Sequence, residues 1–230
     1  MQTILGAGGP IADELARALH RDHTTDIRLV SRKPVAVNDT DELLAADLTD
    51  AAATSRAVAG SEVAYLTVGL PLNTELWERQ FPVMMRNVID ACAEHRTKLV
   101  FFDNTYMYPG TPAPQTESTA FAPAGRKGAV RGHLATMMLE AMGSGRVEGL
   151  IGRAPEFYGP GRTKSYTNTL VFDRIRAGNA LSSRSTLTPS APSSGPPTPA
   201  APSPCSATPP TPTVRRGTFP STPTARRMPS

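Results

Sequence analysis

Glycines near the amino terminus form the pattern with the clearest chemical meaning in this chain. Gly6, Gly8 and Gly9 follow a short apolar run, residues 3–5, and Ala12 completes the spacing Gly-x-x-Gly-x-x-Ala. A strand, tight turn and helix in this order direct main-chain N–H groups at one point, where the helix dipole favours a pyrophosphate. The pattern predicts a dinucleotide-binding turn. The alternative is a tight strand–helix connection without a ligand.

Residues 31–33 follow the next strand-like run and bear on which dinucleotide would bind. Sites specific for NAD usually place a carboxylate here, on the ribose 2′-hydroxyl. This chain has Ser31, Arg32 and Lys33 instead. Ser31 can donate to a 2′-phosphate, and Arg32 can pair with it through its planar fork. We therefore expect NADP, with NAD possible, unless the two cations are simply solvated loop charges.

Two later strand ends carry further residues that suit a dinucleotide. Asp47, followed by Leu48, can accept a hydrogen bond from the adenine amino group. Thr67 and Gly69 belong to a stretch of small residues that lets the coenzyme pass close to the main chain. We assign all four to the predicted coenzyme site, because ligands of open α/β sheets bind at the carboxyl ends of the strands.

The elements that must position these residues alternate along the first 180 residues. Strand-like runs cover residues 2–5, 27–31, 42–45, 63–68, 98–102 and 147–152, and helical patterns cover 11–21, 52–58, 75–94 and 128–142, with Thr74 as the expected cap of the third helix. Strands alternating with helices predict a parallel sheet covered on both faces. Right-handed crossovers then give an α/β, Rossmann-like doubly wound fold.

Composition changes near residue 180. Residues 181–230 contain 13 of the 23 prolines and no Asp or Glu. Such a segment cannot bury enough apolar surface to offset its chain entropy. We expect a dinucleotide-binding domain over 1–180 and a disordered Pro/Ser/Thr-rich tail over 181–230. Much of the formal charge of +4 lies in tail arginines, so it does not indicate nucleic-acid binding.

The remaining composition points to a cytoplasmic protein without a metal. Cys92 and Cys205 suggest neither a disulfide framework nor a metal cluster, and the four histidines show no ligand spacing. The amino terminus is a core strand, which argues against a signal peptide. Apolar runs are too short for a membrane span.

Several segments together resemble the extended or atypical short-chain dehydrogenases of the NAD-dependent epimerase/dehydratase family. Besides the glycine turn, they are residues 47–48, 87–92, 100–108 and 153–161. The resemblance spans roughly residues 1–178. It implies oxidoreduction or epimerisation of a small hydroxyl or carbonyl compound, such as a nucleotide sugar. It also implies pairing of subunits through helices, so a homodimer is possible.

The family's catalytic set is altered in this chain. Its usual members are a Ser/Thr hydroxyl and a Tyr-x-x-x-Lys pair, in which the Lys lowers the phenol pKa from one helical turn away. Here Lys127 stands in the Tyr position and Arg131 in the Lys position, while Asn104 or Thr105 occupies the hydroxyl position. Asn cannot exchange a proton, and Arg effectively never loses one.

Three interpretations of the altered set remain open. In the first, Lys127 donates the proton beside Thr105, which requires burial or Arg131 to lower its pKa. In the second, Lys127 and Arg131 clamp an anionic part of coenzyme or substrate. In the third, both are solvent-facing charges one turn apart. The first interpretation predicts an enzyme. The alternative function is that of a non-catalytic regulator or sensor that binds NADP(H).

The tail indicates a change of reading frame near Leu181. The resembled family continues there with further strands and a small substrate-binding lobe, whereas this chain turns to Pro/Ser/Thr-rich sequence. GC-rich codons permitted for residues 203–222, read one nucleotide earlier, give an ordinary globular sequence. Loss of the lobe would impair activity and leave exposed surface. The competing interpretation is a genuine Pro-rich linker, and sequencing the DNA from codon 170 decides between them.

Overall fold

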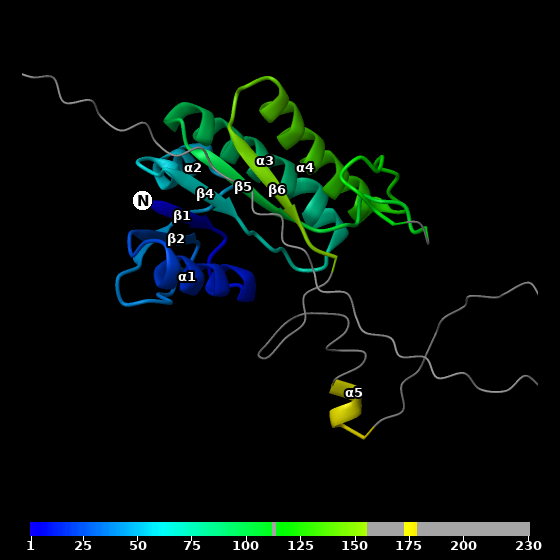
Figure 1. Cartoon of the computed structure of the whole chain (residues 1–230), viewed down its shortest axis with the longest axis horizontal. Coiled ribbons are helices and arrows are strands. Elements are labelled where there is room, and N and C mark those ends of the chain that lie inside the picture. Colours follow the sequence, from blue (N-terminus) through cyan, green and yellow to red (C-terminus); the bar gives the residue numbers. More distant parts are fainter. Residues whose placement is uncertain (112–113, 156–172, 179–230) are drawn as a thin grey trace, which may run out of the picture. The chain divides into compact units, whose positions relative to one another are not determined.

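The computed structural model describes residues 1–111, 114–155 and 173–178. In these ranges a parallel sheet runs in the order β3-β2-β1-β4-β5-β6 (Figure 1). Its strands are β1 (Gln2–Leu5), β2 (Ile27–Ser31), β3 (Glu42–Ala45), β4 (Val63–Leu66), β5 (Lys98–Asp103) and β6 (Gly149–Arg153). The order reverses between β1 and β4, so the loops after these two strands meet at one edge. This confirms the predicted Rossmann-like doubly wound fold, and ligands of such sheets bind at this reversal.

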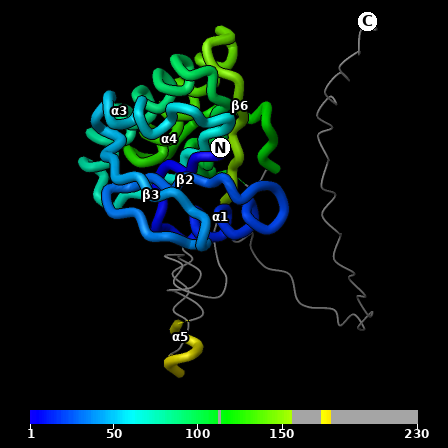
Figure 2. The backbone as a smooth tube through the Cα atoms, turned by 90° about the vertical axis from the view of Figure 1, so that its left-hand side faces the viewer, coloured from blue at the N-terminus to red at the C-terminus, as the bar shows by residue number. Residues whose placement is uncertain are grey.

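Helices cover the two faces of the sheet unequally. The helices are α1 (Pro10–Asp22), α2 (Ala51–Val58), α3 (Thr74–His95), α4 (Arg126–Gly143) and the short α5 (Asp173–Arg176). Helix α1 lies on one face, and α2, α3 and α4 lie on the other (Figures 1 and 2). Alternation along β1 explains the two cores: Ile4 packs with α1, whereas Leu5 packs in the larger cluster with α2–α4.

All predicted elements are present, and most lie within one residue of the expected bounds. The larger differences are at β4, at β6 and at the start of α4, which begins at Arg126 and not at residue 128. The expectation that the fourth strand continues to residue 68 was wrong, because its partner β1 ends at Leu5 and pairing stops at Leu66. The last strand begins at Gly149 and not at 147, since Val147 still belongs to the turn that closes on Ala141.

The predicted cap of α3 was also wrong by one residue. Asn73 is the N-cap, and its side chain accepts a hydrogen bond from the N–H of Leu76 at 2.9 Å. Thr74 is the first residue of the helix itself. Asn is among the preferred N-cap residues because its short side chain reaches the free N–H groups of the first turn.

Several predictions fall on residues that the structure does not describe. These are the tail over 181–230, its boundary at residue 180 and the Glu-Phe-Tyr-Gly-Pro-Gly stretch of residues 156–161. They stay predictions from the sequence.

Candidate functional site

The turn after β1 is built from glycines in conformations that other residues avoid. Gly6 and Gly8 have φ angles of +105° and +93°. A Cβ atom on Gly6 would lie 2.7 Å from the main chain of Val68, just beyond β4. Only glycine therefore lets the β1–α1 turn pass this close to the β4–α3 loop. The N–H of Gly6 donates to the carbonyl of Val30 at 2.9 Å, which ties the turn to β2 as well.

Helix α1 begins beside this turn with an open amino terminus. Gly9 is its N-cap and has an extended backbone, φ −108°, with no side-chain cap. A Cβ atom on Gly9 would meet no atom within 4 Å, so space for a ligand lies in front of the first helical turn. Ala12 is 2% exposed and lets α1 pack closely on the sheet, as the spacing predicted. The free N–H groups of a helix start are a binding site for phosphate.

Asp47, in the loop after β3, is a carboxylate held by its own turn. Its Oδ1 accepts hydrogen bonds from the N–H of Thr49 at 2.9 Å and from its hydroxyl at 2.8 Å. These hydrogen bonds, and more weakly the charge of Arg32, lower the pKa of Asp47 below its ordinary value. Arg32 itself is exposed directly after β2. An ionised acceptor and a solvent-facing cation thus share this end of the predicted coenzyme site.

The other residues predicted for the coenzyme site line the same edge. Ser31 ends β2 and is half-buried, and its carbonyl accepts from the N–H of Ala46. Leu48 is buried, and its carbonyl accepts hydrogen bonds from the side chains of Thr54 and Asn87. Thr67 continues from β4 and donates through both N–H and hydroxyl to the carbonyl of Leu5, at 2.9 and 3.2 Å. A Cβ atom on Gly69 would meet nothing within 4 Å, which leaves room beside the turn after β1.

Arg131 is buried, which excludes the interpretation that both cations of the altered set face solvent. It is 5% exposed, and its Nε donates to Oδ1 of the buried Asp103 at 2.8 Å, with a second contact from Nη2. Its guanidinium also lies 5.2 Å from the ring centroids of Phe81 and Phe101. Burial raises the pKa of Asp103 above its ordinary value, although the charge of Arg131 acts in the opposite direction.

Lys127, one turn earlier on α4, has different partners. Its Nζ donates to the carbonyl of Leu72 at 3.1 Å and lies 5.4 Å from the ring centroid of Trp77. The two predicted catalytic cations therefore lie on one helix but contact separate parts of the site. Lys127 is half-buried and faces the β4–α3 loop, where it remains a candidate proton donor.

Asn104 and Thr105 lie in the turn directly after β5. The N–H of Asn104 donates to Oδ1 of Asp103 at 2.8 Å, and the side-chain oxygen of Asn104 accepts from the N–H of Tyr106 at 3.0 Å. Thr105 is half-buried, and its carbonyl accepts from the N–H of Tyr108 at 3.1 Å. The structure thus keeps both candidates for the hydroxyl position on one short, hydrogen-bonded turn.

Arg153 lies at the end of β6 and belongs to the segment of residues 153–161 that resembles the family. It was not predicted as a site residue. Its Nη1 donates to the phenol oxygen of Tyr108 at 2.9 Å. Its Nε faces Oδ2 of Asp103 at 3.8 Å, and both of these atoms are buried without a hydrogen-bond partner. Asp103 therefore lies between two guanidinium groups.

Asp103, Gly128 and Asn87 were missed as well. A Cβ on Gly128 would overlap the carbonyl of Tyr106, so this glycine lets α4 approach the turn after β5. Asn87 on α3 donates to the carbonyl of Leu48 at 2.9 Å and holds the loop after β3. The sequence offered two signals for these residues, the Lys-Gly-x-x-Arg spacing and an acidic residue at a strand end. Neither signal shows which residue the side chain contacts.

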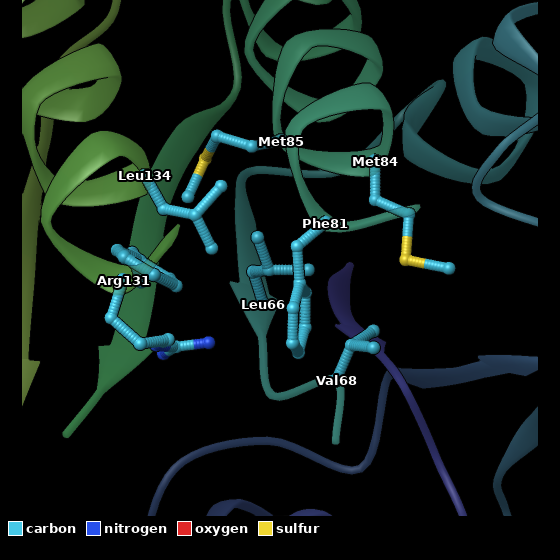
Figure 3. A pocket seen from close by; sticks show the side chains of 8 residues that line it. Leu66, Val68, Phe81, Met84, Met85, Arg131 and Leu134 are labelled. Carbon is cyan, nitrogen blue, oxygen red and sulfur yellow. The ribbon is translucent and has the colours of Figure 1, made fainter. Parts of the chain in front are cut away.

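A small cavity lies beside this cluster, between α3, α4 and the sheet. Its walls are apolar side chains such as Phe81 and Leu134, with Arg131 as the polar member (Figure 3). Its volume of about 10 Å³ has room for roughly one water molecule. It is a packing gap and not a substrate pocket.

A metal site and a membrane span would each require a different arrangement of residues. Among residues 1–111, 114–155 and 173–178, no three or more His, Cys, Asp or Glu side chains gather as metal ligands. In the same ranges, every helix is too short or too polar to cross a membrane.

The fold and this site define a class of protein, and comparison with known proteins gives its family. The chain belongs to the NAD-dependent epimerase/dehydratase family, whose sequence profile matches residues 3–189. None of the curated proteins compared with it matches significantly.

Solved structures with the same fold include three sugar-modifying enzymes. A UDP-galactose 4-epimerase has a TM-score of 0.68 at 18% identity, covering 79% of this chain and 65% of its own. UDP-glucuronic acid 4-epimerase from Bacillus cereus, in complex with NAD, has a TM-score of 0.67 at 14% identity, with the same coverages. Uronate dehydrogenase from Agrobacterium tumefaciens has a TM-score of 0.58 at 18% identity, covering 64% and 57%. The chain thus spans less than two thirds of their length.

Proposed function

We propose that this protein binds a nicotinamide dinucleotide across the carboxyl ends of β1, β2, β3 and β4. The observation that carries the proposal is the turn after β1, where Gly6 can only be glycine and Gly9 opens the start of α1. The pyrophosphate would lie on the free N–H groups of this helix start. Asp47 would accept from the adenine, and the main chain around Thr67 and Gly69 would border the nicotinamide half.

The proposed coenzyme is NADP rather than NAD. Arg32 is exposed directly after β2, and its charge contributes to lowering the pKa of Asp47. A 2′-phosphate beside Ser31 would therefore meet both a cation and a hydroxyl group. A 2′-phosphate prefers such a pair, because Arg binds phosphate through two parallel hydrogen bonds. The NAD complexes among the structural neighbours leave NAD as the second candidate.

The reaction we propose is oxidoreduction or epimerisation of a sugar-like hydroxyl or carbonyl compound. The neighbours that act on UDP-sugars and uronates favour this substrate class. A bound nicotinamide supplies the hydride acceptor or donor. Of the chain's own residues, Thr105 would orient the substrate oxygen and Lys127 would move its proton.

A second candidate is a protein that senses NADP(H) without turnover. The observation that favours it is the commitment of both cations to partners within the chain, Lys127 to the carbonyl of Leu72 and Arg131 to Asp103.

Coenzyme titration of the full chain tests the central proposal. Gly9→Val should abolish binding of NADPH, followed by its fluorescence, because the new side chain fills the space in front of α1 without straining the backbone. Gly125→Val is the matched control, since Gly125 is also an extended glycine N-cap with open space beside it, at the start of α4. Equal affinity of wild type and Gly9→Val for NADPH contradicts the proposal.

The same titration with NADH measures the coenzyme preference. Arg32→Ala should weaken NADPH binding by about tenfold, the value of roughly one charged hydrogen bond, and leave NADH binding unchanged. Turnover is then followed at the nicotinamide absorbance band with UDP-glucose, UDP-glucuronate and free glucuronate. Tight binding of NADPH and NADP⁺ without a change in absorbance favours the sensor.

A further inference from the structure

We infer that Arg131 and Arg153 are positioning residues, which act through Asp103 to fix the turn of residues 104–108 and touch neither coenzyme nor substrate. This inference rests on the proposed function only for what the turn does, namely to present Asn104 and Thr105 to the site. It differs from the family pattern, in which the residue at the Arg131 position takes part in the chemistry itself.

A single oxygen of Asp103 links helix α4 to the start of the turn. Its carboxylate is 0% exposed, and Oδ1 accepts from Nε of Arg131 at 2.8 Å and from the N–H of Asn104 at 2.8 Å. The position of the guanidinium therefore determines where the first N–H of the turn is held. Removing Arg131 would leave a buried carboxylate without its strongest partner, which is strongly destabilising unless the group moves.

Arg153 connects the two ends of the same turn. It faces Oδ2 of Asp103 at 3.8 Å and donates to the phenol oxygen of Tyr108 at 2.9 Å. Its guanidinium lies 5.5 Å from the ring centroid of Tyr108 and 5.2 Å from that of Phe121. These contacts fix the guanidinium between Asp103, which directly precedes the turn, and Tyr108, its last residue.

The turn is further constrained from within and from outside. Its internal hydrogen bonds join Asn104 to Tyr106 and Thr105 to Tyr108. Gly128 allows the first turn of α4 to lie against the carbonyl of Tyr106. Arg131 lies one helical turn after Gly128, so this close approach of α4 places its guanidinium within hydrogen-bond distance of Asp103.

Arg131 has little left to offer a ligand. One edge of its guanidinium binds Asp103, Nη2 is also 3.5 Å from the carbonyl of Phe102, and two aromatic rings lie within 5.2 Å. A ligand that binds through Nε or Nη2 would have to displace these partners. The geometry therefore favours a role in holding the turn over a direct contact with ligand.

The chain contains its own reporter for the position of the turn. Trp77 is the only tryptophan. Its ring stacks on that of Tyr106, in the turn, with centroids 6.4 Å apart and an interplanar angle of 9°. A shift of the turn changes this stack and with it the emission of Trp77, whereas a mere loss of global stability leaves the emission of the folded protein unchanged.

The first measurement compares Trp77 emission among folded variants of the full chain. Asp103→Asn and Arg131→Met should move the emission toward that of Tyr106→Leu, the reference for a lost stack. Arg126→Met is the matched control, because it removes an arginine of the same helix whose partner, Glu78, is on the surface. Where Arg131→Met alone fails to fold, Arg131→Met/Asp103→Asn takes its place, since it removes both charges of this ion pair while Arg153 keeps its hydrogen bond to Tyr108.

The second measurement is the NADPH dissociation constant of the same variants. Asp103→Asn and Arg131→Met should each weaken binding by about tenfold, as for one lost hydrogen bond, and Arg126→Met should bind as the wild type does. The double variant should be no weaker than the worse of its two single variants. Weaker binding by Arg131→Met with unchanged Trp77 emission would show direct contact and overturn the inference, as would fully additive losses. If the wild type binds no coenzyme, the proposed function fails, and the emission comparison alone decides the positioning role.

Discussion

Asp47 shows how a single side chain can be prepared for a ligand by its own turn. Two hydrogen bonds from Thr49 hold the carboxylate and lower its pKa. Both bonds end on Oδ1, so Oδ2 is the oxygen that the proposed adenine contact would use. The residue that we assign to the coenzyme thus also stabilises the loop after β3.

This double role predicts a pH-dependent contribution of Asp47 to stability. Because its folded pKa lies below its ordinary value of about 3.9, the ionised form stabilises the fold above that pH, and the stabilisation is lost as the pH falls through the lowered pKa. Asp47→Asn should therefore reduce the difference in free energy of unfolding between about pH 5 and pH 3, by up to about 1 kcal/mol.

Urea unfolding at the two pH values measures this difference. Thr49→Val, which removes one of the two donors, should give an intermediate result, and Asp39→Asn on an exposed loop should behave as the wild type. The same loss on acidification in wild type and Asp47→Asn would contradict the assignment.

At this scale the sequence predicted residue types better than residue partners. The glycine spacing identified the turn after β1 because positive φ angles and a close approach leave almost no alternative to glycine. The partners of Lys127 and Arg131 could not be predicted, because Leu72 comes from the loop after β4 and Asp103 from the end of β5. A spacing of four on a helix places two side chains on one face but does not determine what that face meets.

At the scale of elements, the alternation of apolar residues determined most helices and strands. Element ends depended on neighbours that the local pattern does not show, as at β4, where the length of β1 sets the last paired residue. The start of α3 depended on which of two adjacent polar residues has an extended backbone. Asn73 does, with φ −103° and ψ 118°.

The corrected cap gives a prediction for α3. Asn73→Ala should lower the free energy of unfolding by about 1 kcal/mol, because it leaves the N–H of Leu76 without its side-chain partner. Thr74→Ala, at the first helical position, should cost less. Urea denaturation followed by circular dichroism compares the two variants, and a larger effect of Thr74→Ala would restore the cap expected from the sequence.

At the scale of the whole molecule, the rules for crossover connections predicted the doubly wound arrangement of the strands. They did not predict how completely each face of the sheet is covered by other elements. Parallel sheets normally carry helices on both faces. On β6, Ile151 packs against the core below α4, so its neighbour Leu150 points to the opposite face, where it is 49% exposed. Val100, paired with Leu150 across β5, shares that face and is half-buried.

This exposed side chain predicts self-association that a polar substitution relieves. Leu150→Thr keeps a residue that favours strands and removes apolar surface from the open face, so the weight-average mass in sedimentation at increasing concentration should fall. Val35→Thr is the control, because Val35 is 68% exposed but lies on the loop after β2. Coenzyme affinity should be unchanged in both variants, since neither residue lines the proposed site. Equal masses for wild type and Leu150→Thr at all concentrations would show that this face does not drive association.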